Sequence, residues 1–195
     1  MANVIKVGPW GGKGGSTSDT SVANATKVGP WGGKGGSTSD TLVANATKVE
    51  PWGGKGGSTW DTLVVTQDIT HIKIYYGDVI DGLDITYVTN GKRQTLKVGD
   101  TIGAVWNEII LKKDEYFNSI SGFYGPTIPE DVIAIKQLTL GTNKGTSVTV
   151  GTTQGGDFPF PFSPLLLYKI VGFLGHSSTV IDAIGIYYEE IMGKN

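Results

Sequence analysis

The sequence predicts an all-β protein, and two observations carry this prediction. Of the 195 residues, 30 are glycine and only two are methionine, which is typical of a chain with many turns and few helices. Short runs rich in β-branched and aromatic residues recur between Gly, Asn, Asp and Pro, whereas no window keeps apolar residues at helical spacing. Many short strands joined by tight turns favour antiparallel sheets packed as a sandwich, a barrel or a prism.

The N-terminal part of the chain contains a 21-residue repeat. The sequence KVGPWGGKGGSTSDT begins at Lys6 and again at Lys27, and the variant KVEPWGGKGGSTWDT begins at Lys48. Each copy predicts a short strand, a Gly-rich loop and a second short strand, which cannot bury a core alone. Only the third copy continues directly into the rest of the chain. We therefore expect one domain over residues 48–195, and two extra copies over residues 1–47 that are extended or poorly ordered.

Further strands follow one another toward the C-terminus. Asn90-Gly91 lies between two alternating strands and predicts a tight hairpin, Lys113-Asp114 suggests a similar one, and residues 141–145 form another turn cluster. The prolines between residues 159 and 164 are incompatible with a central strand and predict an edge strand or a loop. The expected strands cover residues 69–76, 83–89, 94–98, 107–112, 116–124, 132–139, 147–150, 170–174 and 184–188.

The last two expected strands are joined by a short polar loop that leads to a carboxylate. Residues 175–179 are small and polar, so the backbone can approach a ligand closely and donate its N–H groups. Asp182 could accept hydrogens from two neighbouring hydroxyl groups, which is the arrangement that a sugar ring presents. The alternative is that Asp182 caps a turn through its own backbone.

Composition and spacing argue against several other functions. A net charge of −2 gives no electrostatic basis for binding nucleic acid, and no run of about 20 apolar residues can span a membrane. Cysteine is absent, and the two histidines, His71 and His176, form no short metal-binding motif. No catalytic triad spacing, Walker loop or second carboxylate in the loop of Asp182 is present. We expect no catalytic residues, no metal, no cofactor and no signal peptide.

Four blocks of the sequence resemble the jacalin-related lectins, in particular their mannose-specific branch. The blocks are PWGGKGGSTWD from Pro51, YYGDVIDGLDITY from Tyr75, ISGFYG from Ile120 and KIVGFLGHSSTVIDAIGIYY from Lys169, in the family's order. The resemblance covers the chain from Lys48 onward. It implies a β-prism of three four-stranded antiparallel sheets with pseudo-threefold symmetry. It also implies a plant lectin without enzymatic activity that is cytoplasmic or nucleocytoplasmic and forms homo-oligomers.

The resemblance further implies a carbohydrate-binding site made by two loops. Family members hold the sugar with a backbone N–H of a glycine loop, which falls on Gly57 here, and with a GxxxD loop. The second loop falls on Ser178, Thr179, Val180 and Asp182. Ser178 departs from the glycine that begins the family's loop. If the backbone requires a positive φ there, serine strains the loop and weakens binding.

A second GxxxD loop could form another carbohydrate site. It contains Gly77, Asp78, Val79 and Asp81, and some members of the family that this chain resembles use the equivalent loop for a second mannose. Its partner loop, residues 99–104, is one residue longer than in those members and lacks the paired glycines. The alternative interpretation is an exposed hairpin turn.

Two functions from different classes remain after this reasoning. The first is a lectin for mannose- or glucose-containing glycans that contacts neither nucleic acid nor membrane and gains avidity by presenting several weak sites together. The second is a non-lectin interaction or assembly module, in which the sugar site has decayed and strand exchange between near-identical copies has taken its place.

Overall fold

The computed structural model describes residues 46–62, 68–89, 91–101, 105–127, 132–162 and 167–191. These ranges contain twelve β-strands and no helix long and apolar enough to cross a membrane. The strands are β1 (Thr47–Gly53), β2 (Ser58–Asp61), β3 (Ile69–Tyr76), β4 (Ile80–Thr89), β5 (Lys92–Gly99), β6 (Trp106–Ile110), β7 (Phe117–Pro126), β8 (Ile133–Thr142), β9 (Ser147–Gly151), β10 (Phe158–Phe162), β11 (Tyr168–Ser177) and β12 (Ile181–Glu190).

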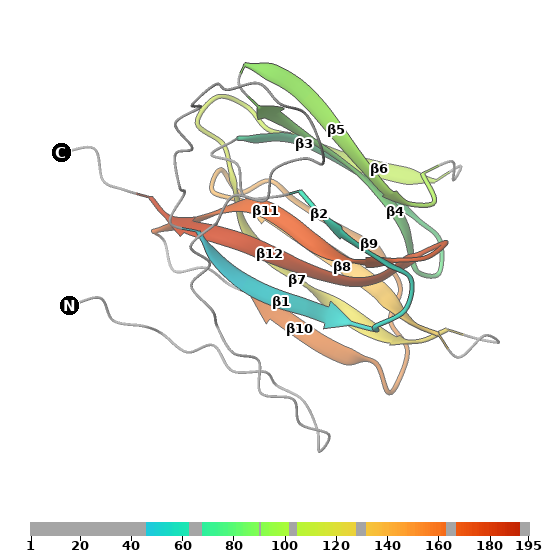
Figure 1. Ribbon diagram of the computed structural model, residues 1–195. Coiled ribbons are helices and arrows are strands. Elements are labelled where there is room, and N and C mark those ends of the chain that lie inside the picture. The colour runs from blue at the N-terminus through green and yellow to red at the C-terminus, as the bar shows by residue number, and fades with distance from the viewer. Residues whose placement is uncertain are drawn as a thin grey trace, which may run out of the picture.

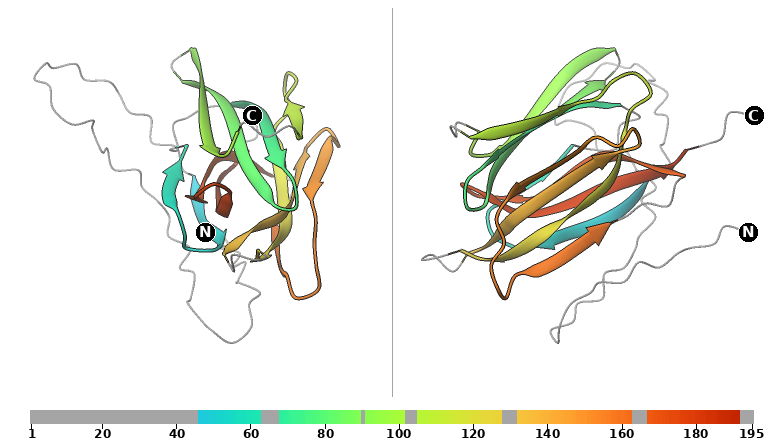
Figure 2. Two further views of the ribbon diagram at one scale, coloured as in Figure 1. Left: turned by 90° about the vertical axis from the view of Figure 1, so that its right-hand side faces the viewer. Right: turned by 180° about the vertical axis from the view of Figure 1, so that it is seen from behind.

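The strands form three four-stranded antiparallel sheets. Sheet A has the order β1-β12-β11-β2, sheet B has β5-β4-β3-β6, and sheet C has β10-β7-β8-β9. Figure 1 and the left view of Figure 2 show the three sheets arranged around a common axis. In every sheet the two inner strands form a hairpin and the outer strands flank it. This architecture confirms the predicted all-β class and the three-sheet prism.

Sheet A joins the two ends of the described chain. Its inner strands β11 and β12 form the C-terminal hairpin, whereas β1 and β2 come from the third repeat copy and occupy both outer edges. Val49 of β1 lies opposite Ile186 of β12, and Trp60 of β2 lies opposite Gly175 of β11. One short N-terminal segment therefore closes the sheet from both sides.

The turn signals predicted one hairpin correctly and another wrongly. β4 and β5 pair directly, with Thr89 opposite Lys92, as the dipeptide Asn90-Gly91 predicts, although Asn90 itself lies outside the described residues. The turn at Lys113-Asp114 instead connects β6 of sheet B to β7 of sheet C, so the hairpin predicted there is wrong. The chain does turn tightly at this point, since Asp114 has a positive φ of 59°. The proline-containing strand β10 lies at the edge of sheet C, as expected.

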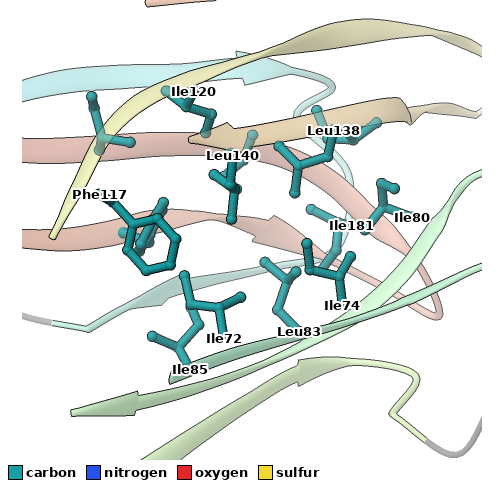
Figure 3. Close-up of a cluster of buried hydrophobic side chains, with 14 of the residues drawn as sticks. Ile72, Ile74, Ile80, Leu83, Ile85, Phe117, Ile120, Leu138, Leu140 and Ile181 are labelled. Atoms are coloured by element: carbon teal, nitrogen blue, oxygen red, sulfur yellow. The ribbon is translucent and has the colours of Figure 1, made fainter. Parts of the chain in front are cut away.

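The inner faces of the three sheets meet in one hydrophobic core. Side chains of a strand alternate between its two faces, so every second residue of an inner strand points toward the axis. Figure 3 shows Ile72 and Ile74 of β3, Leu138 and Leu140 of β8, and Ile181 of β12 turned toward one another, and each is at most 1% exposed. Burying one such side chain contributes about 1.5–3 kcal/mol. Because the three sheets share this core, each depends on the other two.

The described fold begins one residue before β1. Ala46 is only 2% exposed and packs with Val171, Leu174 and Tyr187 of sheet A. Residues 1–45, which include both upstream repeat copies, lie outside the described residues. A truncation that keeps every described contact therefore ends at Asn45.

A buried carboxylate stabilises the connection from β6 of sheet B to β7 of sheet C. Glu115 follows β6 and is 8% exposed. Its carboxylate accepts hydrogen bonds from the hydroxyl groups of Thr142 at 2.7 Å and Thr146 at 2.8 Å, and from the amide of Lys112 at 3.0 Å. These bonds, the one from Thr142 foremost, hold the pKa of Glu115 at about 2, below its ordinary value of 4.5. These hydrogen bonds therefore join the β6–β7 connection to the turn between β8 and β9.

Removing residues 1–45 should leave a folded protein with a nearly unchanged melting temperature, because the sheets and the core that the structure describes are built from residues after 45. We expect the shortened chain to form fewer higher oligomers than the full chain, since the spare copies of the β1–β2 segment are gone. Size-exclusion chromatography with light scattering and a thermal melt measure both properties. A shortened chain that fails to fold would show that an upstream copy supplies the native edge strands.

Glu115 should make the free energy of unfolding sensitive to acid. Because its pKa in the folded protein is lowered, the ionised carboxylate stabilises the fold above about pH 4.5, and this contribution is lost as the pH falls toward about 2. Glu115→Gln cannot ionise, so we expect lower stability than the parent at neutral pH and a smaller loss between these two pH values. Urea unfolding across that range is the measurement. Equal losses in parent and variant would contradict the assignment.

Candidate functional site

Three backbone contacts are related by the pseudo-threefold symmetry of the prism. In each sheet the amide that follows an outer strand donates to a carbonyl of an inner strand, at 2.9 to 3.0 Å. The donor and acceptor pairs are Gly54 and Asp182 in sheet A, Asp100 and Asp81 in sheet B, and Thr152 and Lys136 in sheet C. The two aspartates and the lysine therefore occupy equivalent positions. Figure 1 shows the β1–β2, β3–β4 and β11–β12 loops at the same end of the prism.

A glycine precedes the donor in all three contacts. Gly53, Gly99 and Gly151 have φ values of 124°, 69° and 83°, a region that other residues rarely adopt. A Cβ at any of them would also collide with the carbonyl oxygen to which the next amide donates. These glycines bring the outer-strand loops close to the residues that begin the inner strands.

Asp182 is the predicted ligand-binding carboxylate, and it lies completely buried at the start of β12. Its Oδ1 accepts a long hydrogen bond of 3.3 Å from the Ser178 hydroxyl. Its Oδ2 is buried and has no hydrogen-bond partner within the described part of the chain. A buried carboxylate oxygen without a donor costs free energy, so this oxygen favours a ligand or solvent group that supplies one.

The glycine loop between β1 and β2 covers this carboxylate. Gly57 has a φ of 65° and packs so closely on the backbone of Ser177 and Ser178 that a Cβ would overlap it. A Cβ at Gly56 would lie 3.3 Å from Oδ1 of Asp182. The structure thus brings together the two predicted loops, which are more than a hundred residues apart in the sequence.

The backbone strain expected at Ser178 does not arise. Asp114 is the only non-glycine residue with a positive φ in the described ranges, so Ser178 adopts an ordinary conformation. The Ser178 amide donates to the Val180 carbonyl at 3.0 Å and forms a tight turn. The candidate donors of this loop are therefore the amides of Thr179 and Val180. Serine affects the site through its hydroxyl group, which contacts the Asp182 carboxylate, rather than through its backbone.

The second predicted loop has the same turn but a different electrostatic environment. The Gly77 amide donates to the Val79 carbonyl at 2.9 Å, as in the first loop. Asp81 is half-buried, and burial, followed by the negative charges of Asp100 and Asp78, raises its pKa. In the first loop, the residue equivalent to Asp100 is Gly54, which carries no charge. Residues 102–104 of the partner loop lie outside the described residues, so the second site stays a prediction.

The third equivalent position has the opposite charge. Lys136 is 4% exposed, and its ammonium group donates to the Pro126 carbonyl at 3.4 Å. The sequence did not reveal this equivalence, because the loop before β8 is longer than the other two. The signal that could have found it is Gly151-Thr152, whose glycine ends β9 as Gly53 of Gly53-Gly54 ends β1. The residue at this position, Lys136, therefore supplies no carboxylate to accept hydrogen bonds from hydroxyl groups.

The histidines do not create a metal centre. His71 of β3 lies 3.0 Å from the Glu108 carboxylate of β6, and His176 lies opposite Thr59 in sheet A. No group of three or more His, Asp or Glu side chains in the described ranges could hold a metal ion.

The family model of the Jacalin-like lectin domain matches residues 49–187. The chain belongs to the jacalin-like lectin family. This membership confirms the resemblance carried by the four sequence blocks, and it places the carboxylate and glycine loops described above within a lectin domain.

Similar jacalin-related lectins occur in plants. Jacalin-related lectin 19 of Arabidopsis thaliana is 33% identical over 185 residues, covering 94% of this chain and 79% of the relative. Horcolin of Hordeum vulgare is 32% identical over 190 residues, covering 96% of this chain and 98% of the relative. The similarity therefore extends over most of each chain.

Solved lectin structures share the fold. Malaysian banana lectin matches with a TM-score of 0.65 and 36% identity, covering 74% of this chain and 99% of its own. The artocarpin–mannotriose complex has a TM-score of 0.63 and 33% identity, covering 73% and 96%. A mannose binding jacalin related lectin from Ananas comosus has a TM-score of 0.65 and 28% identity, covering 74% and 98%.

Proposed function

We propose that this jacalin-like lectin binds mannose- or glucose-type sugars without catalysing a reaction. The site is formed by the Gly57 loop and the loop from Ser178 to Asp182. The observation that carries the proposal is the buried Oδ2 of Asp182, which has no hydrogen-bond partner within the described residues and lies in a lectin domain. Two similar proteins support the choice of sugar, the artocarpin–mannotriose complex and the mannose binding lectin of Ananas comosus.

The proposed contacts follow from the chemistry of each group. Asp182 accepts one sugar hydroxyl at Oδ2 and a second at Oδ1, where the sugar competes with or displaces the Ser178 hydroxyl. The amides of Gly57, Thr179 and Val180 donate to sugar oxygens. Hydrogen bonds from hydroxyl groups to a carboxylate are charge-assisted and stronger than neutral ones. A pair of adjacent hydroxyl groups at fixed spacing therefore fits this site better than a single hydroxyl.

The residues of the site supply binding groups but no reactive pair. Hydrolysis of a glycosidic bond by the usual route requires two carboxyl groups on either side of the bond. In the described loop pair Asp182 is accompanied by Gly56, Gly57, Ser178 and Thr179, which carry no second acid. The arrangement therefore supports recognition rather than hydrolysis.

Each site should bind weakly. A small solvated sugar held by a handful of hydrogen bonds reaches a Kd of about 1 mM, which corresponds to roughly −4 kcal/mol. Useful affinity for a glycan surface then requires several sites presented together. We accordingly propose that the protein acts as a homo-oligomer on glycans with repeated terminal sugars.

Asp182→Asn should abolish measurable binding of methyl α-mannoside while leaving the fold intact. The substitution keeps the shape of the side chain but removes the charge that strengthens two hydrogen bonds. Isothermal calorimetry measures binding, and circular dichroism checks the fold. Asp81→Asn is the matched control, because it changes the equivalent residue of the second loop. It should leave binding at the first site unchanged, and it should lower the number of sugars bound per chain only if the second site is functional.

Unchanged binding in Asp182→Asn would remove this residue from the site. If the unmodified protein binds no sugar and is not retained on mannose-agarose, the alternative function as an assembly module is favoured. The three repeat copies are the observation behind that alternative.

Ser178→Gly should bind methyl α-mannoside at least as tightly as the parent, and up to a few-fold tighter. The variant removes a hydroxyl group that contacts Oδ1 of Asp182, and it relieves no backbone strain because Ser178 has an ordinary φ. Ser177→Ala, which removes the neighbouring hydroxyl, is the control and should change affinity little. Calorimetry at a single pH compares all three proteins. A clear loss of affinity in Ser178→Gly would mean that the hydroxyl contacts the sugar or holds the loop.

A further inference from the structure

The outer edges of β12 and β11 accept one continuous segment of chain. β1 pairs along β12 and β2 pairs along β11, so residues 47–62 enclose the C-terminal hairpin from both sides, as Figure 1 shows. The segment also contacts sheet C, because the ring of Trp52 stacks on that of Phe160 at 5.2 Å. Both edges of sheet A are therefore filled by a single continuous unit.

Specific polar contacts fix the end of this unit. The Tyr187 hydroxyl donates to Asp61 at 2.7 Å, and burial together with this bond raises the pKa of Tyr187, so the hydroxyl stays protonated. The Thr62 hydroxyl donates to the Phe173 carbonyl at 3.0 Å and accepts from the Phe173 amide at 2.9 Å, and the Thr62 amide donates to the same carbonyl at 2.9 Å. These contacts require Asp and Thr at two successive positions.

Both upstream repeat copies carry the same contact residues. The equivalents of Trp52, Asp61 and Thr62 are Trp31, Asp40 and Thr41 in the second copy, and Trp10, Asp19 and Thr20 in the first. The glycines of the loop are also identical in the three copies. Each upstream copy therefore has the residues needed to make almost every contact that β1 and β2 make.

One buried contact distinguishes the third copy. Trp60 is 8% exposed in the main core, and its ring lies against Gly175, where a Cβ would come within 2.8 Å of it. The upstream copies have Ser39 and Ser18 at this position. The only other difference within the paired strands of the second copy is glycine in place of Glu50, whose ion pair with Lys48 is partly exposed and contributes little.

We propose that the outer edges of β11 and β12 form an acceptor for any of the three repeat copies, and that Trp60 selects the third. Replacing a buried tryptophan by a small residue leaves a cavity, which favours the third copy on the order of a hundredfold or more. The short connection from Asp61 to β3 adds to this preference, because the second copy must close a loop 21 residues longer. Moving the tryptophan from the third copy to the second should then move the edge strands with it.

Engineered disulfides can report which copy is seated, because the chain has no cysteine of its own. Thr59 lies opposite His176, and directly opposed residues of antiparallel strands have Cα atoms about 4.5–5.5 Å apart, within the range of a disulfide. The equivalent of Thr59 in the second copy is Thr38. Full chains carrying His176→Cys with either Thr59→Cys or Thr38→Cys form the two matched reporters.

In the parent background we expect the disulfide from position 176 to position 59 to form readily, and the one to position 38 to form at least about tenfold less. In a chain that also carries Ser39→Trp and Trp60→Ser, the order should reverse. Oxidation in a glutathione buffer followed by peptide mass mapping identifies the bonds, and a non-reducing gel separates bonds within one molecule from bonds between two. If the reversed preference appears in disulfides between two molecules, the tryptophan still selects the copy, and the edge segment is donated by a second molecule of this chain.

Three results would overturn the proposal. The first is a bond to position 59 that still dominates after the tryptophan has moved, since the connection rather than Trp60 would then decide. The second is a moved-tryptophan chain that fails to fold by circular dichroism, since the second copy would then be unable to replace the third. The third comes from Ser39→Trp alone, in which two tryptophan-bearing copies compete. There the bond to position 38 should rise severalfold over the parent, and no rise would show that the upstream copies do not reach the acceptor.

Discussion

The pairing of one short N-terminal segment with the C-terminal hairpin is the constraint on which the rest of this structure depends. β1 and β2 lie on both outer edges of sheet A, and their partners are far away in the sequence; the Thr62–Phe173 bonds span 111 residues. Contacts between residues this far apart carry a loop-closure entropy cost, and topologies dominated by them fold slowly. Without this pairing, the core would be open on the side of Trp60.

The same pairing assembles the candidate site. The Gly54 amide meets the Asp182 carbonyl, and Gly57 packs on the turn that begins at Ser178, only because β1 and β2 are seated on the hairpin. Stability of the fold and geometry of the site therefore arise from one set of contacts.

Backbone symmetry and side-chain chemistry diverge around the prism axis. The three sheets repeat the same amide-to-carbonyl contact behind a glycine with positive φ, yet the equivalent residues are Asp182, Asp81 and Lys136. The first carboxylate is beside glycines, the second is beside two further carboxylates that raise its pKa, and the third position is cationic. Symmetry of the fold thus offers three similar backbone frames that differ in their local charge.

The sequence by itself determined the class, the strands and both carboxylate loops. Alternation of apolar residues predicts which face of a strand is buried, and the resemblance to the lectin family marks the loops that end in Asp182 and Asp81, because both rest on short local stretches of sequence. The sequence predicted the hairpin at Asn90-Gly91 correctly because turn chemistry is also local. It was wrong at Lys113-Asp114, where the turn chemistry is correct but the two strands join different sheets.

Only the tertiary structure decided the remaining features, because each depends on residues that are distant in the chain. The conformation of Ser178 and the contact of its hydroxyl with Asp182 follow from the way the hairpin closes under the glycine loop. The equivalence of Lys136 with the two aspartates follows from strand register, which a longer loop hides in the sequence. Burial of Trp60 likewise follows from its seat opposite Gly175, where the absence of a side chain leaves room for the indole ring.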